Sequence, residues 1–190
     1  MSWSTELGPD NRPKGWWAKT ALAGLLAGTA MLAFLMVAFS AMGRGAWYPV
    51  NGVASILPVF QPPGALLSPT FVPGPSLFGL TLHLLVSAVF GVIYGGAVEA
   101  FAPRRARSWY WEGLMGMGYG VLVWVFSGYG GSYLVDAQAV VFESVSFLAG
   151  HLIYGLVLGL SLAALTTQRD LLAVTFAPEV RPVREPVERR

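Results

Sequence analysis

Four long runs of apolar residues dominate this chain of 190 residues and restrict what it can fold into. They span roughly 17–42, 77–102, 109–128 and 140–166. A helix needs about 20 apolar residues to cross a hydrocarbon layer of about 30 Å. Backbone groups in lipid must be satisfied within their own segment, and no alternating strand pattern is visible. The sequence therefore predicts an all-α polytopic membrane protein, a bundle of four transmembrane helices.

The composition excludes several classes of function. Only 12% of the residues are charged, against roughly 25% in soluble domains. The absence of cysteine excludes disulfides, thiolate metal sites and a cysteine nucleophile. No nucleotide-binding loop, serine triad or HExxH helix is present, and a net charge of +2 gives no reason to expect a nucleic acid partner. We expect a protein that is not an enzyme and whose first partner is the lipid bilayer.

The basic residues lie almost entirely on one side of the predicted membrane. Of twelve Lys and Arg residues, only Arg44 lies between the first two apolar runs, and none lies between the last two, which leaves eleven on the other side. The positive-inside rule then predicts an inner-membrane protein with both termini in the cytoplasm. Tryptophans such as Trp17 and Trp109 lie at the same boundary, as in an aromatic belt.

The chain divides into a cytoplasmic N-terminal segment over 1–16, a transmembrane domain over 17–172 and a proline-rich, charged cytoplasmic tail over 173–190. The loop over 43–76 carries one charge and seven prolines, and it is unusually apolar. Proline confines such a loop to turns and extended pieces, although Pro49 can open a short helix that ends at Leu57. We expect this loop to pack on the outer face of the bundle as a cap.

The two halves of the transmembrane domain resemble each other. A shift of 92 residues aligns the first helix with the third, and a shift of 68 aligns the second with the fourth. The matched pairs include Trp17 with Trp109, Gly24 with Gly116, Gly28 with Gly120, His83 with His151, and Gly91 with Gly159. Both halves have the same predicted orientation, so the sequence predicts two parallel two-helix repeats.

Glycines three or four residues apart recur in all four apolar runs. Small residues at this spacing let helix backbones approach, and close packing supplies the association that the hydrophobic effect cannot supply in lipid. We therefore predict helix packing at Gly24, Gly28, Gly91, Gly95, Gly116, Gly120, Gly155 and Gly159.

His83 and His151 are the only histidines and occupy matching repeat positions near the outer edge of the membrane. They can be hydrogen-bonded interfacial residues with no ligand, which would leave the protein without a cofactor. They can instead bind haem b from both faces, or bind a metal together with Glu143. As a third alternative they can titrate in response to external acid, since histidine has a free pKa of about 6.5. The sequence leaves these alternatives open.

Motifs in the second half of the chain resemble the YagU-type four-helix inner-membrane proteins, mainly over residues 83–172. They are His83-x3-Ser87-x2-Phe90-x3-Tyr94, Glu99-x-Phe101, Trp111-x-Gly113-Leu114-x-Gly116, and Glu143-x-Val145-Ser146-x3-Gly150-His151-Leu152. The resemblance implies a part in stress or acid tolerance and supplies no catalytic residue. The loop that follows Arg44 departs from the family pattern, and apolar residues replace a third histidine near Val123.

Taken together, these features predict a membrane protein that is an accessory subunit of a larger complex or a stress-related protein. A bundle of four helices has little interior for a substrate path. A small transporter or channel, or a haem- or metal-binding subunit, is the alternative. Other membrane subunits, or further copies of the chain, are the expected protein partners.

Overall fold

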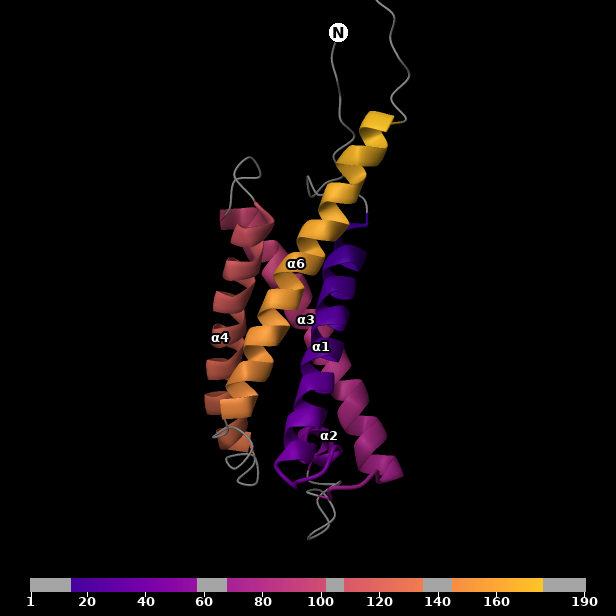
Figure 1. The fold of residues 1–190 in the computed structure, drawn as a ribbon, viewed down its shortest axis with the longest axis vertical. Helices are drawn as coiled ribbons and strands as arrows, with labels where there is room; N and C mark the ends of the chain where they lie inside the picture. The colour runs from indigo at the N-terminus through magenta and orange to yellow at the C-terminus, as the bar shows by residue number, and fades with distance from the viewer. Residues whose placement is uncertain (1–14, 58–67, 102–107, 135–144, 176–190) are drawn as a thin grey trace, which may run out of the picture.

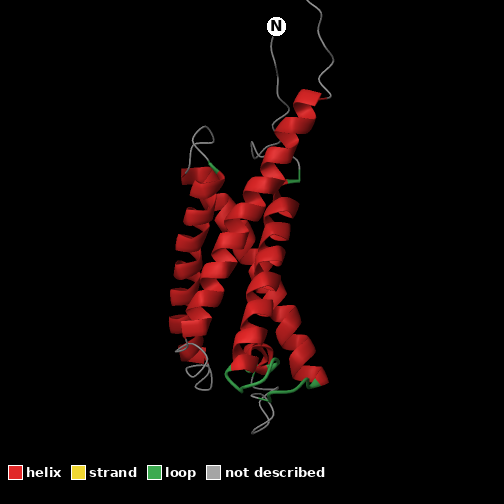
Figure 2. Cartoon of the chain, viewed as in Figure 1, coloured by secondary structure: helices red, strands yellow, loops and turns green. Residues whose placement is uncertain are grey.

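The computed structural model describes residues 15–57, 68–101, 108–134 and 145–175, and within these ranges every regular element is helical. The helices are α1 (Trp16–Ala41), α2 (Tyr48–Ala54), α3 (Pro73–Phe101), α4 (Trp109–Leu134) and α6 (Val145–Thr175). The predicted all-α fold is confirmed over the described residues, and Figure 2 shows helices and connecting loops only.

Three helices are long and apolar enough to cross a membrane: Trp16–Ala41, Pro73–Phe101 and the Val145–Thr166 part of α6. They coincide with three of the four predicted crossings and give the chain the helices of a multi-pass membrane protein. The 26 residues of α4 match α1 in length but include more glycine and aromatic residues, and α4 is not among these three.

The helices extend beyond several predicted ends. α3 begins at Pro73, four residues before the apolar run, because proline is well tolerated in the first turn of a helix. α4 continues to Leu134, past the expected end at Gly128. α6 continues to Thr175 through charged residues, since a helix can leave the hydrocarbon and go on in water. The first predicted residues of that run, 140–144, lie outside the described part.

The long helices lie roughly along one axis, with neighbours antiparallel (Figure 1). α1 packs against α3 and α6, and α6 packs against α4. α1 begins and α6 ends at the same end of the molecule, and α2 lies at the opposite end, which we call the α2 end (Figure 1). At about 1.5 Å per residue the 31 residues of α6 span roughly 46 Å, so α6 projects beyond the other helices.

One hydrophobic core runs between α1, α3 and α6. Its buried side chains come from every fourth residue of α1, from the start of α2, and from α3 and α6. They are Ala23, Ala27, Met31, Leu35, Phe39, Tyr48, Tyr94, Val98, Tyr154, Leu158 and Leu162. Aromatic residues of α3 and α4, among them Phe90 and Tyr119, pack against this cluster.

The cap at the α2 end is a packed helix. Tyr48 of α2 stacks on Phe39 of α1 with ring centroids 5.3 Å apart, and the Val50 carbonyl lies against Gly79 of α3, where a Cβ would clash. α2 ends at Ala54, three residues before the helix end at Leu57 expected from the sequence, and hydrogen-bonded turns continue to Leu57. The left-handed backbone at Gly43 (φ 74°) helps the chain reverse between α1 and α2.

Asn51 organises this cap and is completely buried. Its Nδ2 donates to the carbonyls of Ser68 (2.9 Å) and Thr70 (3.1 Å), and its Oδ1 accepts from Ser76 Oγ at 2.7 Å. The Ser76 hydroxyl in turn accepts from the amide of Val72 at 2.9 Å. One amide side chain thus ties α2 to the loop and to the first turn of α3.

Candidate functional site

His83 lies on α3 and reaches across to α1. Its Nε2 is 3.0 Å from the carbonyl oxygen of Gly28. This approach depends on a glycine, because a Cβ at position 28 would clash with the Ser87 side chain one turn along α3. The Ser87 hydroxyl donates to the His83 carbonyl at 2.7 Å. His83 therefore joins two helices at a point where their backbones are unusually close.

His151 lies on α6 and is only 3% exposed. Its Nδ1 is 2.9 Å from the Phe147 carbonyl one turn earlier in the same helix. The Phe147 ring meets the imidazole edge to face, with centroids 4.4 Å apart. The His151 imidazole is thus held by its own helix, whereas the His83 imidazole is held by a neighbouring one.

These hydrogen bonds fix which ring nitrogen carries the proton. A carbonyl oxygen only accepts, so the nitrogen beside it must be the donor. In the neutral ring the other nitrogen then has a free lone pair, which is Nδ1 in His83 and Nε2 in His151. A ring nitrogen that donates to a carbonyl while its partner keeps a lone pair is the arrangement typical of a metal-ligating histidine.

A hydrogen bond joins the two helices that carry the histidines, α3 and α6. One turn along α6 from His151, the Tyr154 hydroxyl donates to the Ser87 carbonyl at 2.9 Å and holds these two helices together. The common depth of the two histidines stays a prediction, and the contact that joins their helices is the one between Tyr154 and Ser87.

The third predicted ligand, Glu143, lies outside the described residues. Among the described residues no three His, Cys, Asp or Glu side chains come together in a way that could hold a metal ion.

The eight predicted glycines lie at two helix crossings. In the first, Gly24 and Gly28 of α1 face Ser87 and Gly91 of α3, and Gly95 faces Thr20 and Trp16. In the second, Gly116 and Gly120 of α4 face Gly155 and the His151 carbonyl of α6, and Gly159 faces the Glu112 carbonyl. At each glycine except Gly95, a Cβ would clash with backbone or with a buried hydroxyl; at Gly95 it would meet the Thr20 methyl.

Tyrosine hydroxyls link α3 to α4. Tyr119 donates to the Phe90 carbonyl at 2.9 Å, and Tyr94 donates to the Glu112 carbonyl at 3.4 Å. The two rings are in contact, with centroids 5.1 Å apart. Near the end away from α2, the Lys19 ammonium donates to the Leu165 carbonyl and links α1 to α6. These side chains join helices, because each donates to a carbonyl of a neighbouring helix.

Sequence reasoning missed two residues that make buried hydrogen bonds, Tyr154 in the interior and Asn51 in the cap. Tyr154 lies three residues after His151, on the same helix face, and that spacing is a signal that could have identified it. Asn51 is an amide within an apolar segment, which also marks it. Comparisons with protein-family models, with curated proteins and with solved structures found no match to this chain.

Proposed function

We propose that this protein is a non-enzymatic inner-membrane component of four transmembrane helices that acts as an accessory subunit, docking to helices of a larger membrane complex. The observation that carries the proposal is that the apolar side chains left free to contact another protein lie on the outside of the helices. The interior is filled by one packed cluster, while large apolar side chains of α3 and α4 face outward. They include Leu77, Leu85, Val89, Ile93, Leu114, Leu122 and Phe126.

The contacts of α4 support the proposal that it is the fourth crossing. Its 26 residues span about 39 Å, which exceeds the hydrocarbon thickness of about 30 Å. Gly116 and Gly120 pack directly on the backbone of α6, a candidate membrane span. A helix in backbone contact with a spanning helix, and antiparallel to it (Figure 1), shares its depth in the membrane.

Two parallel repeats are supported by equivalent contacts. A Cβ on Gly24 would meet the Ser87 carbonyl, and a Cβ on Gly116 would meet the Gly155 carbonyl; a shift of 92 relates the glycines and a shift of 68 relates the carbonyls. Likewise Gly91 faces the Thr20 carbonyl in the first half, and Gly159 faces the Glu112 carbonyl in the second. The repeat therefore has the same register at both crossings.

In the proposed orientation the α2 end faces outward and the opposite end faces the cytoplasm. Eleven of the twelve basic residues of the sequence, all except Arg44, lie in segments that the positive-inside rule assigns to the cytoplasmic side. The indole of Trp109 and the phenol of Tyr110 are well exposed at that end, as expected of aromatic side chains at a membrane–water boundary.

Purification of the tagged full-length chain from its native membrane in a mild detergent tests the accessory role. We expect stoichiometric co-purification of other membrane subunits. A stable species of 20.3 kDa or a homo-oligomer, free of other chains, would contradict it. Proton or ion flux into vesicles that contain the purified protein alone would instead favour the small transporter or channel.

A further inference from the structure

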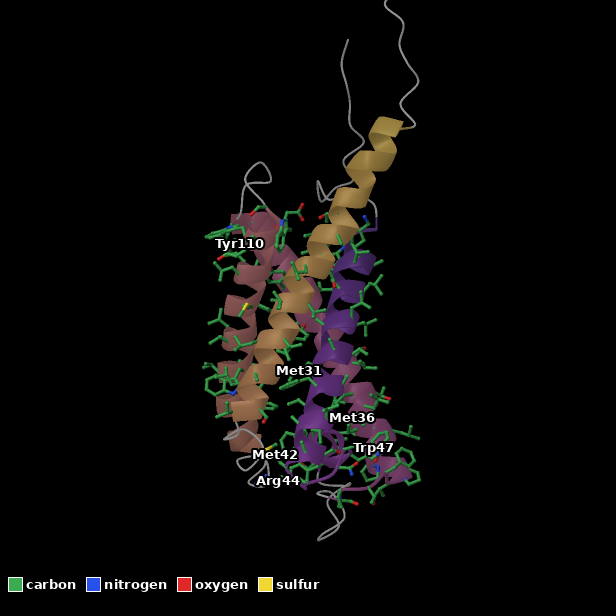
Figure 3. The ribbon with its side chains drawn as sticks, viewed as in Figure 1. Met31, Met36, Met42, Arg44, Trp47 and Tyr110 are labelled. Atoms are coloured by element: carbon green, nitrogen blue, oxygen red, sulfur yellow. The ribbon has the colours of Figure 1, made fainter. Side chains whose placement is uncertain are left out.

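Arg44 is the only basic residue between α1 and α3, and the end of α1 fixes its backbone. The Gly43 amide donates to the Ser40 carbonyl, and the Arg44 amide donates to the Phe39 carbonyl, both at 2.9 Å. With Gly43 in the left-handed conformation (φ 74°), these bonds form the Schellman motif that closes the C-terminus of a helix. Arg44 is therefore held in one place at the α2 end, where Figure 3 shows it.

The Arg44 guanidinium lies over the ring of Tyr48, with its central carbon 5.6 Å from the ring centroid. The Tyr48 ring is itself held in place, because it is buried and stacked on the Phe39 ring. A guanidinium over an aromatic face keeps its N–H donors at its edge, where two oxygens of one anion can accept from them. Arg44 is exposed, so these donors are accessible from outside the cap.

The cap supplies no carboxylate to pair with this charge. The segment over 43–76 contains neither Asp nor Glu. The acidic side chains that the structure describes are those of Glu99, in the last turn of α3, and Glu112, in the first turn of α4, and both turns lie at the end opposite to α2 (Figure 1). Within the described part of the chain, the Arg44 guanidinium therefore has an aromatic ring as its partner and no anion.

The length of α1 places Arg44 at the level of the lipid headgroups. The 26 residues of α1 span about 39 Å, which exceeds a hydrocarbon layer of about 30 Å by about 9 Å. α1 begins with Trp16 and Trp17, and tryptophan is typical of a membrane–water boundary, so the last turn of α1 reaches the headgroup region on the other side. Arg44 follows three residues after the end of α1 at Ala41.

The aromatic pair of Trp47 and Phe71 supports this depth. Their rings meet edge to face with centroids 4.8 Å apart, and Phe71 is 45% exposed. The Trp47 amide donates to the Pro69 carbonyl at 3.4 Å, and a Cβ on Gly45 would clash with Pro69, so the two segments that carry these rings are held together. Exposed aromatic side chains on a fixed backbone are expected at a membrane–water boundary.

We propose that Arg44, held by Tyr48, binds the phosphate of an anionic phospholipid, which belongs to the outer leaflet in the orientation proposed above. The guanidinium donates two N–H groups to two phosphate oxygens, and the Tyr48 ring keeps the guanidinium in position. A headgroup with an amine would find no carboxylate in the cap for its ammonium, so the chemistry favours a headgroup without one, such as that of phosphatidylglycerol. The site rests on the proposed crossing of the membrane by α1 and α3, and not on the accessory role.

A lipid titration tests the site. Full-length protein in a mild detergent is titrated with phosphatidylglycerol, and native mass spectrometry counts the lipids bound per chain. Arg44→Gln should weaken the binding of one lipid by about tenfold, because it removes the charge-assisted hydrogen bonds. Arg44→Lys keeps the charge without the planar fork and should fall between the two. Arg12→Gln removes the same charge from the N-terminal segment and is the matched control for anionic lipids attracted by the cytoplasmic basic residues.

Three outcomes of this titration would refute the site. The first is equal binding of phosphatidylglycerol by Arg44→Gln and Arg12→Gln. The second is full competition by inorganic phosphate at the concentration of the lipid, which would show that the bound anion comes from water. The third is a dependence on Arg44 only after Asp136→Asn and Glu143→Gln, whose positions lie outside the described residues, because Arg44 would then pair with a carboxylate of the chain.

Fluorescence quenching in phosphatidylglycerol vesicles measures the depth of the cap separately. The contribution of Trp47 is the difference between the wild type and Trp47→Phe, which keeps an aromatic ring beside Phe71. Lipids brominated near the headgroup should quench this contribution strongly. Quenching by acrylamide in the water phase alone would place the cap outside the headgroup layer and overturn the proposal. Neither measurement depends on whether other subunits co-purify, so failure of the accessory role would leave both results unchanged.

Discussion

Gly116 and Gly155 lie so close that a Cβ on either would meet the backbone carbonyl of the other. This reciprocal contact joins α4 to α6 and has no room for a side chain on either helix. Backbone atoms cannot move aside as the end of a flexible side chain can. Both positions therefore require glycine.

Gly116→Ala and Gly155→Ala should each destabilise the protein by about 1–3 kcal/mol, the usual cost of overpacking a close contact. Thermal unfolding in detergent, followed by circular dichroism, measures the effect. Gly118→Ala is the control on the same helix, because nothing lies within 4 Å of a Cβ at position 118. Equal melting temperatures for all three variants would show that α4 and α6 do not pack through these glycines.

Asn51→Ala should destabilise the cap by about 1–3 kcal/mol, because it leaves two carbonyls and the Ser76 hydroxyl without their buried partner. Ser76→Ala removes one of the same interactions, so the double variant should lose less than the sum of the single variants. Thr81→Ala, whose exposed hydroxyl bonds only within α3, should have little effect. Strict additivity of Asn51→Ala and Ser76→Ala would contradict a shared network.

Tyr154→Phe should reduce stability by about 0.5–1.5 kcal/mol, since it removes the hydroxyl that donates to the Ser87 carbonyl and leaves the ring in place. Tyr110→Phe makes the same change on a side chain that is 66% exposed and should have no measurable effect. Denaturant titration in mixed micelles compares the two. If both variants unfold at the wild-type midpoint, the hydroxyl of Tyr154 does not link α3 to α6.

Single cysteines test the orientation, and the natural chain contributes no cysteine of its own to confuse the labelling. Ser68→Cys, near the α2 end, should react with an impermeant maleimide added outside intact cells. Ser108→Cys, beside the start of α4, should react only after the cells are opened. The reverse pattern would place the α2 end in the cytoplasm, and labelling of both from outside would show that α3, which lies between the two positions, does not cross the membrane.

Much of the helical architecture could be predicted, because an uncharged apolar run of about 20 residues crosses lipid as a helix. The predicted run over 17–42 differs from α1 by one residue at each end. Helix ends beyond the apolar runs were harder to predict. α6, for example, continues to Thr175 through residues whose composition permits either helix or coil. Hydropathy carries no information about such an end.

The candidate site could be predicted only in part. The sequence identified His83 and His151 as polar candidates within apolar helices, and the structure shows each imidazole bonded to a backbone carbonyl. The hydrogen bond from Tyr154 to the Ser87 carbonyl could not be predicted, because it depends on the register of α6 against α3. The register between two packed helices is a tertiary property, and no local pattern in the amino-acid sequence specifies it.

The hydrogen bonds of His83, Tyr94, Tyr119 and Tyr154 all join α3 to a neighbouring helix and all end on a backbone carbonyl. The acceptor in each is therefore present whatever amino acid occupies that position. A mutation can delete the donor, but no substitution at the acceptor residue can remove the oxygen or compensate for a lost donor. In a genetic screen, suppressors of Tyr154→Phe should accordingly arise elsewhere in the interior rather than at Ser87.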